Sequence, residues 1–382
     1  MFMLKPLALA VLVTLTGHAM AANHSATQTQ EGNNNDVTLE QSGENNAATQ
    51  LQTGDMNRSA ILQAGNGNQA ETTQDGTGHW VEVSQTGDAN TASIYQSTLG
   101  EAATASVTQR GDANTAILNQ LSTYGSNTAT LYQEGNNNTQ LVDQQERADN
   151  TLTARTTGND NIINVVQATG KSAELTQSGD ANQIVLNQQD GPYGASVSIS
   201  QAGDQNVAAV EQWSGSRYEQ YQLTLAQDGM GNAATVTQEG GLNSMEVTQN
   251  GNNNELFADQ SAISGSIVGR SIGNGNVVDI RQGDYQTRTD YVQEGDANIV
   301  TVSQTGNLSH ADLTQLGTSN EITLSQSDLG EIFSNGNAAT VQQNGTANIV
   351  TITQQIAEAS VAGHSAAITQ MGAGNTATII QH

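Results

Sequence analysis

The sequence predicts an all-β fold, a β-solenoid in which two strands make each coil and the coils stack in an amyloid-like cross-β array. Three observations lead to this prediction. A polar phrase that begins with Gln recurs at a spacing of eleven residues, apolar and polar residues alternate inside each phrase, and a Gly-x-x-Asn turn follows every second phrase. Apolar residues do not recur at helical spacing, which argues against an amphipathic helix.

The composition excludes several classes of protein. The chain has 382 residues, of which 35% are hydrophobic and 3% aromatic, less than an ordinary packed core contains. Only 12% of residues are charged, so the chain is not a charge-rich disordered tail. The formal net charge is −27 with 10 Lys and Arg, which leaves no basic surface for nucleic acid or an anionic membrane. Without cysteine, disulfides and thiolate chemistry are also excluded.

The first 21 residues predict export from the cell. Lys5 precedes an apolar run from Leu7 to Leu15, and Ala19-Met20-Ala21 forms a small-x-small cleavage site. The apolar run is too short to span a membrane, and no later span is expected. We therefore divide the chain into a signal peptide (1–21), a short N-terminal segment (22–29) and a repeat β-solenoid (30–382), and expect a secreted protein.

The repeat unit contains two strands and two different turns. Thirty-one phase marks run from Gln30 to Gln381, with Thr156 and Ser271 in place of Gln, and the 30 intervals between them form 15 pairs, or about 15 coils. Every even-numbered interval is eleven residues long and carries Gly two places and Asn five places after its mark. All eight intervals of other lengths are odd-numbered. One turn of each coil of about 22 residues is therefore strict and the other permissive.

Alternate residues of each phrase are expected to face the interior. The series Asn182, Ile184, Leu186 and Gln188 shares one face of a strand. A buried amide is costly unless it is hydrogen-bonded, but in a stack each amide can donate to one neighbouring coil and accept from the other. The Gln residues expected in such ladders include Gln41, Gln85, Gln96, Gln109, Gln120, Gln177, Gln188, Gln201, Gln212, Gln293, Gln304, Gln343, Gln354 and Gln381.

Gly and Asn are expected to form the corners between strands. Gly accepts positive φ, and Asn tolerates left-handed or side-chain-bonded turns. The corner residues include Gly43, Asn46, Gly87, Asn90, Gly111, Asn114, Gly179, Asn182, Gly203, Asn206, Gly295, Asn298, Gly345, Asn348, Gly372 and Asn375. Turn acids such as Asp88 and Asp112 are expected to be solvated, and their mutual repulsion would slow premature assembly.

No catalytic constellation is visible in the sequence. His24, His79, His310, His364 and His382 are far apart, and no metal-ligating spacing joins them. We expect no enzymatic activity, no cofactor and no defined metal site. The sequence also shows no distinct cap beside the first or last phrase, and open solenoid ends can add further strands. The alternative is a secreted solenoid that does not polymerise and acts as an adhesin or surface-binding protein.

Three phrases carry a resemblance to a known family. They are "QTGDANTASIYQ" (85–96), "QRGDANTAILNQ" (109–120) and "QAGDQNVAAVEQ" (201–212), and they resemble the curlin repeat of bacterial curli fibres. The resemblance implies a functional amyloid on the surface of Gram-negative cells that serves as biofilm scaffold and adhesive coat. It also implies self-assembly, a nucleator subunit as templating partner, and export through an outer-membrane pore.

Overall fold

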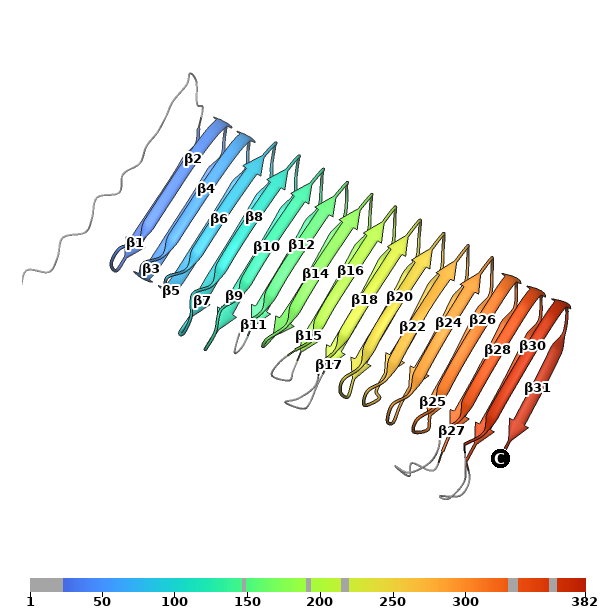
Figure 1. The fold of residues 1–382 in the computed structure, drawn as a ribbon. Coiled ribbons are helices and arrows are strands. Elements are labelled where there is room, and N and C mark those ends of the chain that lie inside the picture. The colour runs from blue at the N-terminus through green and yellow to red at the C-terminus, as the bar shows by residue number, and fades with distance from the viewer. Residues whose placement is uncertain (1–22, 146–148, 190–193, 214–219, 329–335, 357–362) are drawn as a thin grey trace, which may run out of the picture.

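The computed structural model describes residues 23–145, 149–189, 194–213, 220–328, 336–356 and 363–382. The expected signal peptide, residues 1–21, lies outside the described residues. Within them the chain forms 31 β-strands, stacked in sequence order along one axis (Figure 1). None of the described residues belongs to a helix that is long and apolar enough to cross a membrane. The predicted all-β fold is confirmed.

The strands form two parallel sheets. Each strand pairs with the strand two places along the chain, so successive strands alternate between the sheets, as the two-strand coil requires. The odd sheet has 16 strands: β1 (Ser25–Glu31), β3 (Ala47–Asp55), β5 (Gln69–Thr77), β7 (Thr91–Thr98), β9 (Thr115–Ser122), β11 (Thr139–Gln145), β13 (Ile162–Ala168), β15 (Gln183–Gln189), β17 (Val207–Trp213), β19 (Ala233–Glu239), β21 (Glu255–Gln260), β23 (Val277–Gln282), β25 (Ile299–Thr305), β27 (Glu321–Ser327), β29 (Ile349–Gln355) and β31 (Thr376–Gln381).

The even sheet has 15 strands, and one strand from each sheet makes up one coil. Its members are β2 (Asp36–Glu44), β4 (Arg58–Asn66), β6 (Trp80–Thr86), β8 (Thr104–Arg110), β10 (Thr128–Glu134), β12 (Thr151–Thr157), β14 (Ser172–Ser178), β16 (Ser196–Ala202), β18 (Gln222–Asp228), β20 (Ser244–Asn250), β22 (Ser266–Ile272), β24 (Arg288–Glu294), β26 (His310–Thr318), β28 (Ala338–Thr346) and β30 (Ser365–Ala373). The first strand, β1, begins at Ser25, inside the segment 22–29 that the sequence set apart from the solenoid.

The strand register aligns each phase mark with the mark of the neighbouring strand in the same sheet. In the odd sheet, Gln188 of β15 lies between Gln167 of β13 and Gln212 of β17. Because both neighbours are in register, side chains of one kind form columns along the axis at the strand spacing of about 4.8 Å. A one-residue slip would turn every buried side chain to solvent, so the buried face maintains this register.

The core lies between the two sheets as one continuous cluster of apolar side chains. Ile184 and Leu186 of β15 are 0% and 1% exposed, and the alternate residues of the same strand are only partly buried. Among the described residues this core is built from Ala, Val, Ile and Leu, with Met245 and Tyr291 as the exceptions. The outer strands β1, β2 and β31 are exceptions, with their inward side chains left partly exposed.

The two kinds of turn occupy opposite edges of the solenoid. We call the turns that lead from an even-numbered to an odd-numbered strand the strict edge, and those that lead from an odd-numbered to an even-numbered strand the permissive edge. All the intervals of unusual length, such as 96–109 and 212–227, fall on the permissive edge.

Candidate functional site

An unbroken glutamine ladder runs the length of the odd sheet. Each Gln donates from Nε2 to Oε1 of the Gln on the next strand, at 2.7–3.0 Å. The ladder contains Gln30, Gln52, Gln74, Gln96, Gln120, Gln144, Gln167, Gln188, Gln212, Gln238, Gln260, Gln282, Gln304, Gln326, Gln354 and Gln381. Every donor points toward the C-terminal end, so the ladder has a direction.

The second hydrogen of these amides ties the two sheets together. Gln74 Nε2 donates to the backbone oxygen of Arg58 at 3.0 Å, and Gln85 Nε2 of the even sheet donates to Gln69 O at 2.9 Å. Gln74 and Gln85 are each 0% exposed, yet each uses both Nε2 hydrogens and accepts at Oε1. Because these hydrogen bonds are made, burial of the amide carries no large energetic penalty, and Gln can occupy the mark in place of Leu.

The even-sheet ladder is interrupted twice. It contains Gln41, Gln63, Gln85, Gln109 and Gln133, then Gln177, Gln201, Gln227 and Gln249, then Gln293, Gln315, Gln343 and Gln370. Thr156 and Ser271 occupy the two gaps. Ser271 Oγ still donates to Gln293 Oε1 at 2.9 Å, whereas Thr156 leaves the buried Oε1 of Gln177 without a partner.

The strict edge carries an asparagine ladder of opposite direction. Asn206 donates from Nδ2 and from its backbone N to Oδ1 of Asn182, at 3.1 and 3.0 Å. Asn182 Nδ2 in turn donates to Gly203 O at 2.7 Å. The same pattern joins all the corner Asn residues named from the sequence, with Asn68, Asn138, Asn161, Asn232, Asn254, Asn276 and Asn320 between them.

Glycine is required at these corners by a close backbone approach. Gly179 has a φ of +114°, and a Cβ placed on it would collide with the carbonyl oxygen of Gly203 in the next coil. The corner asparagines are not the left-handed residues. That conformation belongs to the preceding position, such as Ala181 at a φ of +56° or Asn45 at +55°, and the Asn side chain serves the ladder instead.

The turn acids do more than the sequence suggested. We expected Asp88, Asp112 and their equivalents to be merely solvated, but Asp112 Oδ1 accepts the backbone N–H of Asp88 at 2.8 Å. Asp204 Oδ1 accepts from Asp180 N at 2.9 Å in the same way, although both acids are exposed. Asp and Asn side chains at this position therefore form a fourth ladder, on the solvent side of the strict edge. Its sequence signal is the recurring Asp or Asn three places after the mark.

His79 takes the position of Asn at a corner of the permissive edge. His79 is 0% exposed, and its Nδ1 accepts the backbone N–H of Ala103 at 3.1 Å, as an Asn Oδ1 does elsewhere. Its Nε2 lies 3.2 Å from Asp75 O. Burial lowers the pKa of His79, which favours the neutral imidazole that these contacts require.

The described ends of the ladders carry complementary unsatisfied groups. At one end, Gln30 and Gln41 donate inward to Gln52 and Gln63, and their Oε1 atoms have no further strand to accept from. At the other end, Gln370 and Gln381 use one Nε2 hydrogen for a backbone oxygen, of Ile349 and Ser365 respectively. No second acceptor contacts either Nε2 among the described residues. In the glutamine ladders, the N-terminal end thus offers acceptors and the C-terminal end offers donors, and the asparagine ladder has the reverse polarity.

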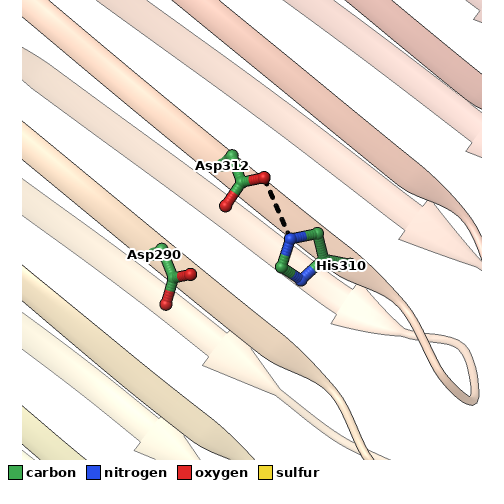
Figure 2. A group of neighbouring side chains, drawn as sticks. All are labelled: Asp290, His310 and Asp312. Atoms are coloured by element: carbon green, nitrogen blue, oxygen red, sulfur yellow. Dashed lines mark hydrogen bonds and ion pairs between the residues drawn. The ribbon is translucent and has the colours of Figure 1, made fainter.

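Within the described residues, one group of His and acidic side chains comes together on the outer face of the even sheet (Figure 2). His310 Nε2 lies 3.0 Å from Asp312 Oδ2. Asp290 pairs with Arg288 at 2.6 Å. The register places Asp290 opposite Asp312, and these contacts offset the repulsion between two like charges on adjacent strands.

Comparison with known families agrees with the repeat geometry. The family model for the curlin associated repeat matches five segments, residues 32–65, 65–97, 222–251, 229–261 and 290–317. These segments include Gln41, Gln85, Gln96, Gln293 and Gln304 of the ladders. No curated protein matches the chain.

Proposed function

Because the chain belongs to the family of curlin-repeat proteins, we propose that it is a secreted structural subunit of curli-type functional amyloid fibres, which polymerises end to end. The observation that carries the proposal is the state of the outer strands. β1 and β31 of the odd sheet, and β2 and β30 of the even sheet, each pair with a strand on one side only among the described residues. Such an edge is a template for another strand.

The outer strands would gain both apolar burial and hydrogen bonds from a second copy. Ala377 and Ile379 of β31 and Leu39 of β2 are only partly buried where their equivalents inside the solenoid are fully buried. Addition of a copy would complete two parallel strand pairs and extend both glutamine ladders. The directed ladders favour a head-to-tail contact, because donors at one end meet acceptors at the other.

The proposed role is structural and not enzymatic. The ladders and the outer strands would carry the assembly, with no cofactor or metal involved. The signal peptide predicted at residues 1–21 supports secretion, and the curlin repeats support a place in an extracellular fibre that forms biofilm matrix and adhesive coat on a Gram-negative cell. A nucleator subunit and an outer-membrane secretion pore are the partners that this role requires.

The test is assembly of residues 22–382 after removal of denaturant, followed by thioflavin T fluorescence and electron microscopy. We expect fibres that seed their own growth and diffract with a meridional spacing of about 4.8 Å. Rods that stay monomeric at high concentration would contradict the proposal and favour an adhesin or other surface-binding solenoid that does not polymerise.

A further inference from the structure

The two sheets contain different numbers of strands, 16 in the odd sheet and 15 in the even sheet, so the molecule is not a whole number of coils. The odd sheet begins with β1 and ends with β31, and the even sheet begins with β2 and ends with β30. Because strands enter the sheets alternately, the strand position that follows β31 belongs beside β30, in the even sheet (Figure 1). The first strand of another copy would have to occupy that position for the solenoid to continue without a gap.

We propose that successive copies in the fibre are related by a half-turn about the solenoid axis, so that β1 of the next copy pairs with β30 and its β2 pairs with β31. This inference rests on the proposed function. If the next copy kept the same orientation, β1 would pair with β31, and one strand position between β30 and the incoming β2 would stay empty. That vacancy would leave two strand edges unpaired in the middle of the fibre, at a high cost in lost hydrogen bonds.

The terminal sequences match in the half-turn arrangement. Residues 24–30 then lie on 364–370, and residues 35–41 lie on 375–381, and 8 of these 14 positions are identical. In the arrangement without rotation, 24–30 lie on 375–381 and 35–41 on 364–370, and only 4 of 14 are identical. The identical positions of the half-turn register are His24/His364, Ser25/Ser365, Ala26/Ala366, Thr29/Thr369, Gln30/Gln370, Asn35/Asn375, Thr38/Thr378 and Gln41/Gln381.

These matches reproduce contacts that already hold neighbouring coils together. His24 Nδ1 accepts the backbone N–H of Asn46 at 3.2 Å, and His364 has the same position at the start of β30. His364 can therefore accept the backbone N–H of His24 in the next copy. At the marks, Gln370 and Gln381 would donate to Oε1 of Gln30 and Gln41 in the next copy, and both ladders would continue.

The corner at residues 370–375 also leaves room for the next copy. A Cβ on Gly345 would collide with the carbonyl oxygen of Gly372, but a Cβ on Gly372 would meet only Asn375, at 3.7 Å. Gly32 of the next copy would fill that place after a half-turn. Asn375 Nδ2 could then donate to the carbonyl oxygen of Gly32, as Asn348 Nδ2 donates to that of Gly372 at 2.9 Å.

The first permissive turns already have the strict sequence. Segments 30–35 ("QEGNNN") and 52–57 ("QTGDMN") have Gly two places and Asn five places after the mark, and 74–79 has Gly and His there. After a half-turn, these corners would follow directly on the strict edge of the preceding copy. Elsewhere on the permissive edge the full Gly and Asn spacing recurs at 238–243, so the strict corners of this edge are concentrated where the half-turn would place them.

Disulfide cross-linking tests the arrangement, because the chain contains no cysteine of its own. The half-turn places Thr27 opposite Ala367, and the unrotated contact places Thr27 opposite Thr378; all three side chains are exposed. Opposite residues on adjacent parallel strands lie about 4.8 Å apart, within the Cα range of a disulfide. We would oxidise fibres of T27C/A367C and of T27C/T378C and compare covalent multimers on a non-reducing gel, with T27C alone as control for lateral contacts.

We expect a ladder of covalent multimers from T27C/A367C and at least tenfold fewer multimers from T27C/T378C. The reverse pattern would overturn the half-turn but leave polymerisation standing. Fibres that cross-link in neither variant, nor in the second set T38C/T378C and T38C/A367C, would overturn the pairing of terminal strands altogether. If the unsubstituted chain forms no fibres, the proposed function itself fails, and with it the half-turn.

Discussion

At the scale of the residue, the solenoid depends on side chains that bond to their own copies. Inside the solenoid, the glutamines at the marks and the asparagines at the strict corners are buried, and each finds ladder partners 21 to 28 residues away in the neighbouring coils. These amides are satisfied only in the stacked state, so they favour one register over all others. The apolar residues between them supply burial but little directional preference.

His79 predicts a pH-dependent contribution to stability. Burial lowers its pKa below the ordinary 6.5, so the unfolded chain binds the proton more readily than the folded chain. Stability from this site is complete above pH 6.5 and falls as the pH drops below that value. His79→Asn, which copies Asn57 one coil earlier, should change stability by less than about 1 kcal/mol at pH 8. It should also reduce the change of the urea unfolding midpoint with pH between pH 6.5 and 5. If that change is the same in the variant, the pH dependence of stability comes from other groups.

Ala181 predicts that relief of backbone strain stabilises the fold. An L-residue in the left-handed region costs about 1–2 kcal/mol, and glycine adds about 0.5–1 kcal/mol of unfolded-state entropy. Ala181→Gly should therefore raise the free energy of unfolding by about 0.5 kcal/mol, and Gly67 and Gly231 already occupy the same corner position. Urea denaturation of the monomer measures the change. Ala209→Gly, in the middle of β17, is the matched control and should lower stability.

At the scale of the element, the side chains of each strand fit those of the two strands beside it in the same sheet. A Cβ on Gly269 of β22 would collide with the ring of Tyr291 on β24, so the missing side chain makes room for a buried tyrosine. Burial raises the pKa of that hydroxyl, partly offset by Ser271, which is the short substitute for a ladder Gln. Gly269 and Tyr291 therefore compensate one another in volume.

The gap at Thr156 predicts a stabilising double substitution. Gln140 points inward from β11 and its Nε2 donates to Tyr132 O at 3.1 Å, while the Oε1 atoms of Gln140 and Gln177 are buried without partners. Thr156→Gln with Gln140→Ala would restore the ladder and the Ala found at position 116 of the preceding odd strand.

We expect the double variant to gain about 1–3 kcal/mol in the free energy of unfolding, the usual cost of an unsatisfied buried group. Thr156→Gln alone should gain less, because Gln140 occupies part of the space. A double variant no more stable than Thr156→Gln alone would show that Gln140 does not obstruct the restored ladder.

At the scale of the whole molecule, the ends differ from the middle only in lacking a neighbour. The interior coils cover one another on both sides, and the surface ion pairs that cross strands, such as Arg270–Glu294 at 2.7 Å, are half exposed and contribute about 0–1 kcal/mol each. The stability of a coil therefore comes from the coils beside it, and an end coil lacks about half of that contribution.

This difference predicts separate effects for one substitution at two places. Gln381→Leu removes the donor at the open end of the odd sheet and should slow fibre elongation several-fold with little change in monomer unfolding. Gln188→Leu leaves one Nε2 hydrogen of Gln167 and the Oε1 of Gln212 without a partner, and should lower the free energy of unfolding by about 1–3 kcal/mol per unsatisfied group. Seeded growth followed by thioflavin T separates the two. Equal elongation rates for both variants would argue against growth at the ends.

The sequence by itself determined the class of fold, the coil length, the buried face and the two kinds of turn. It could do so because each coil repeats the same constraints, so that the periodicity of Gln188 or Asn182 is visible without knowledge of distant contacts. The same periodicity also predicted that Gly occupies the corners.

Only the tertiary structure decided the direction of the ladders, the bonding of the turn acids, the left-handed position before each Asn and the compensation of Gly269 by Tyr291. These features depend on which atoms of adjacent coils approach one another. Residues about 22 positions apart in the chain become neighbours only after the coils stack, and a single phrase of the sequence carries no record of that contact.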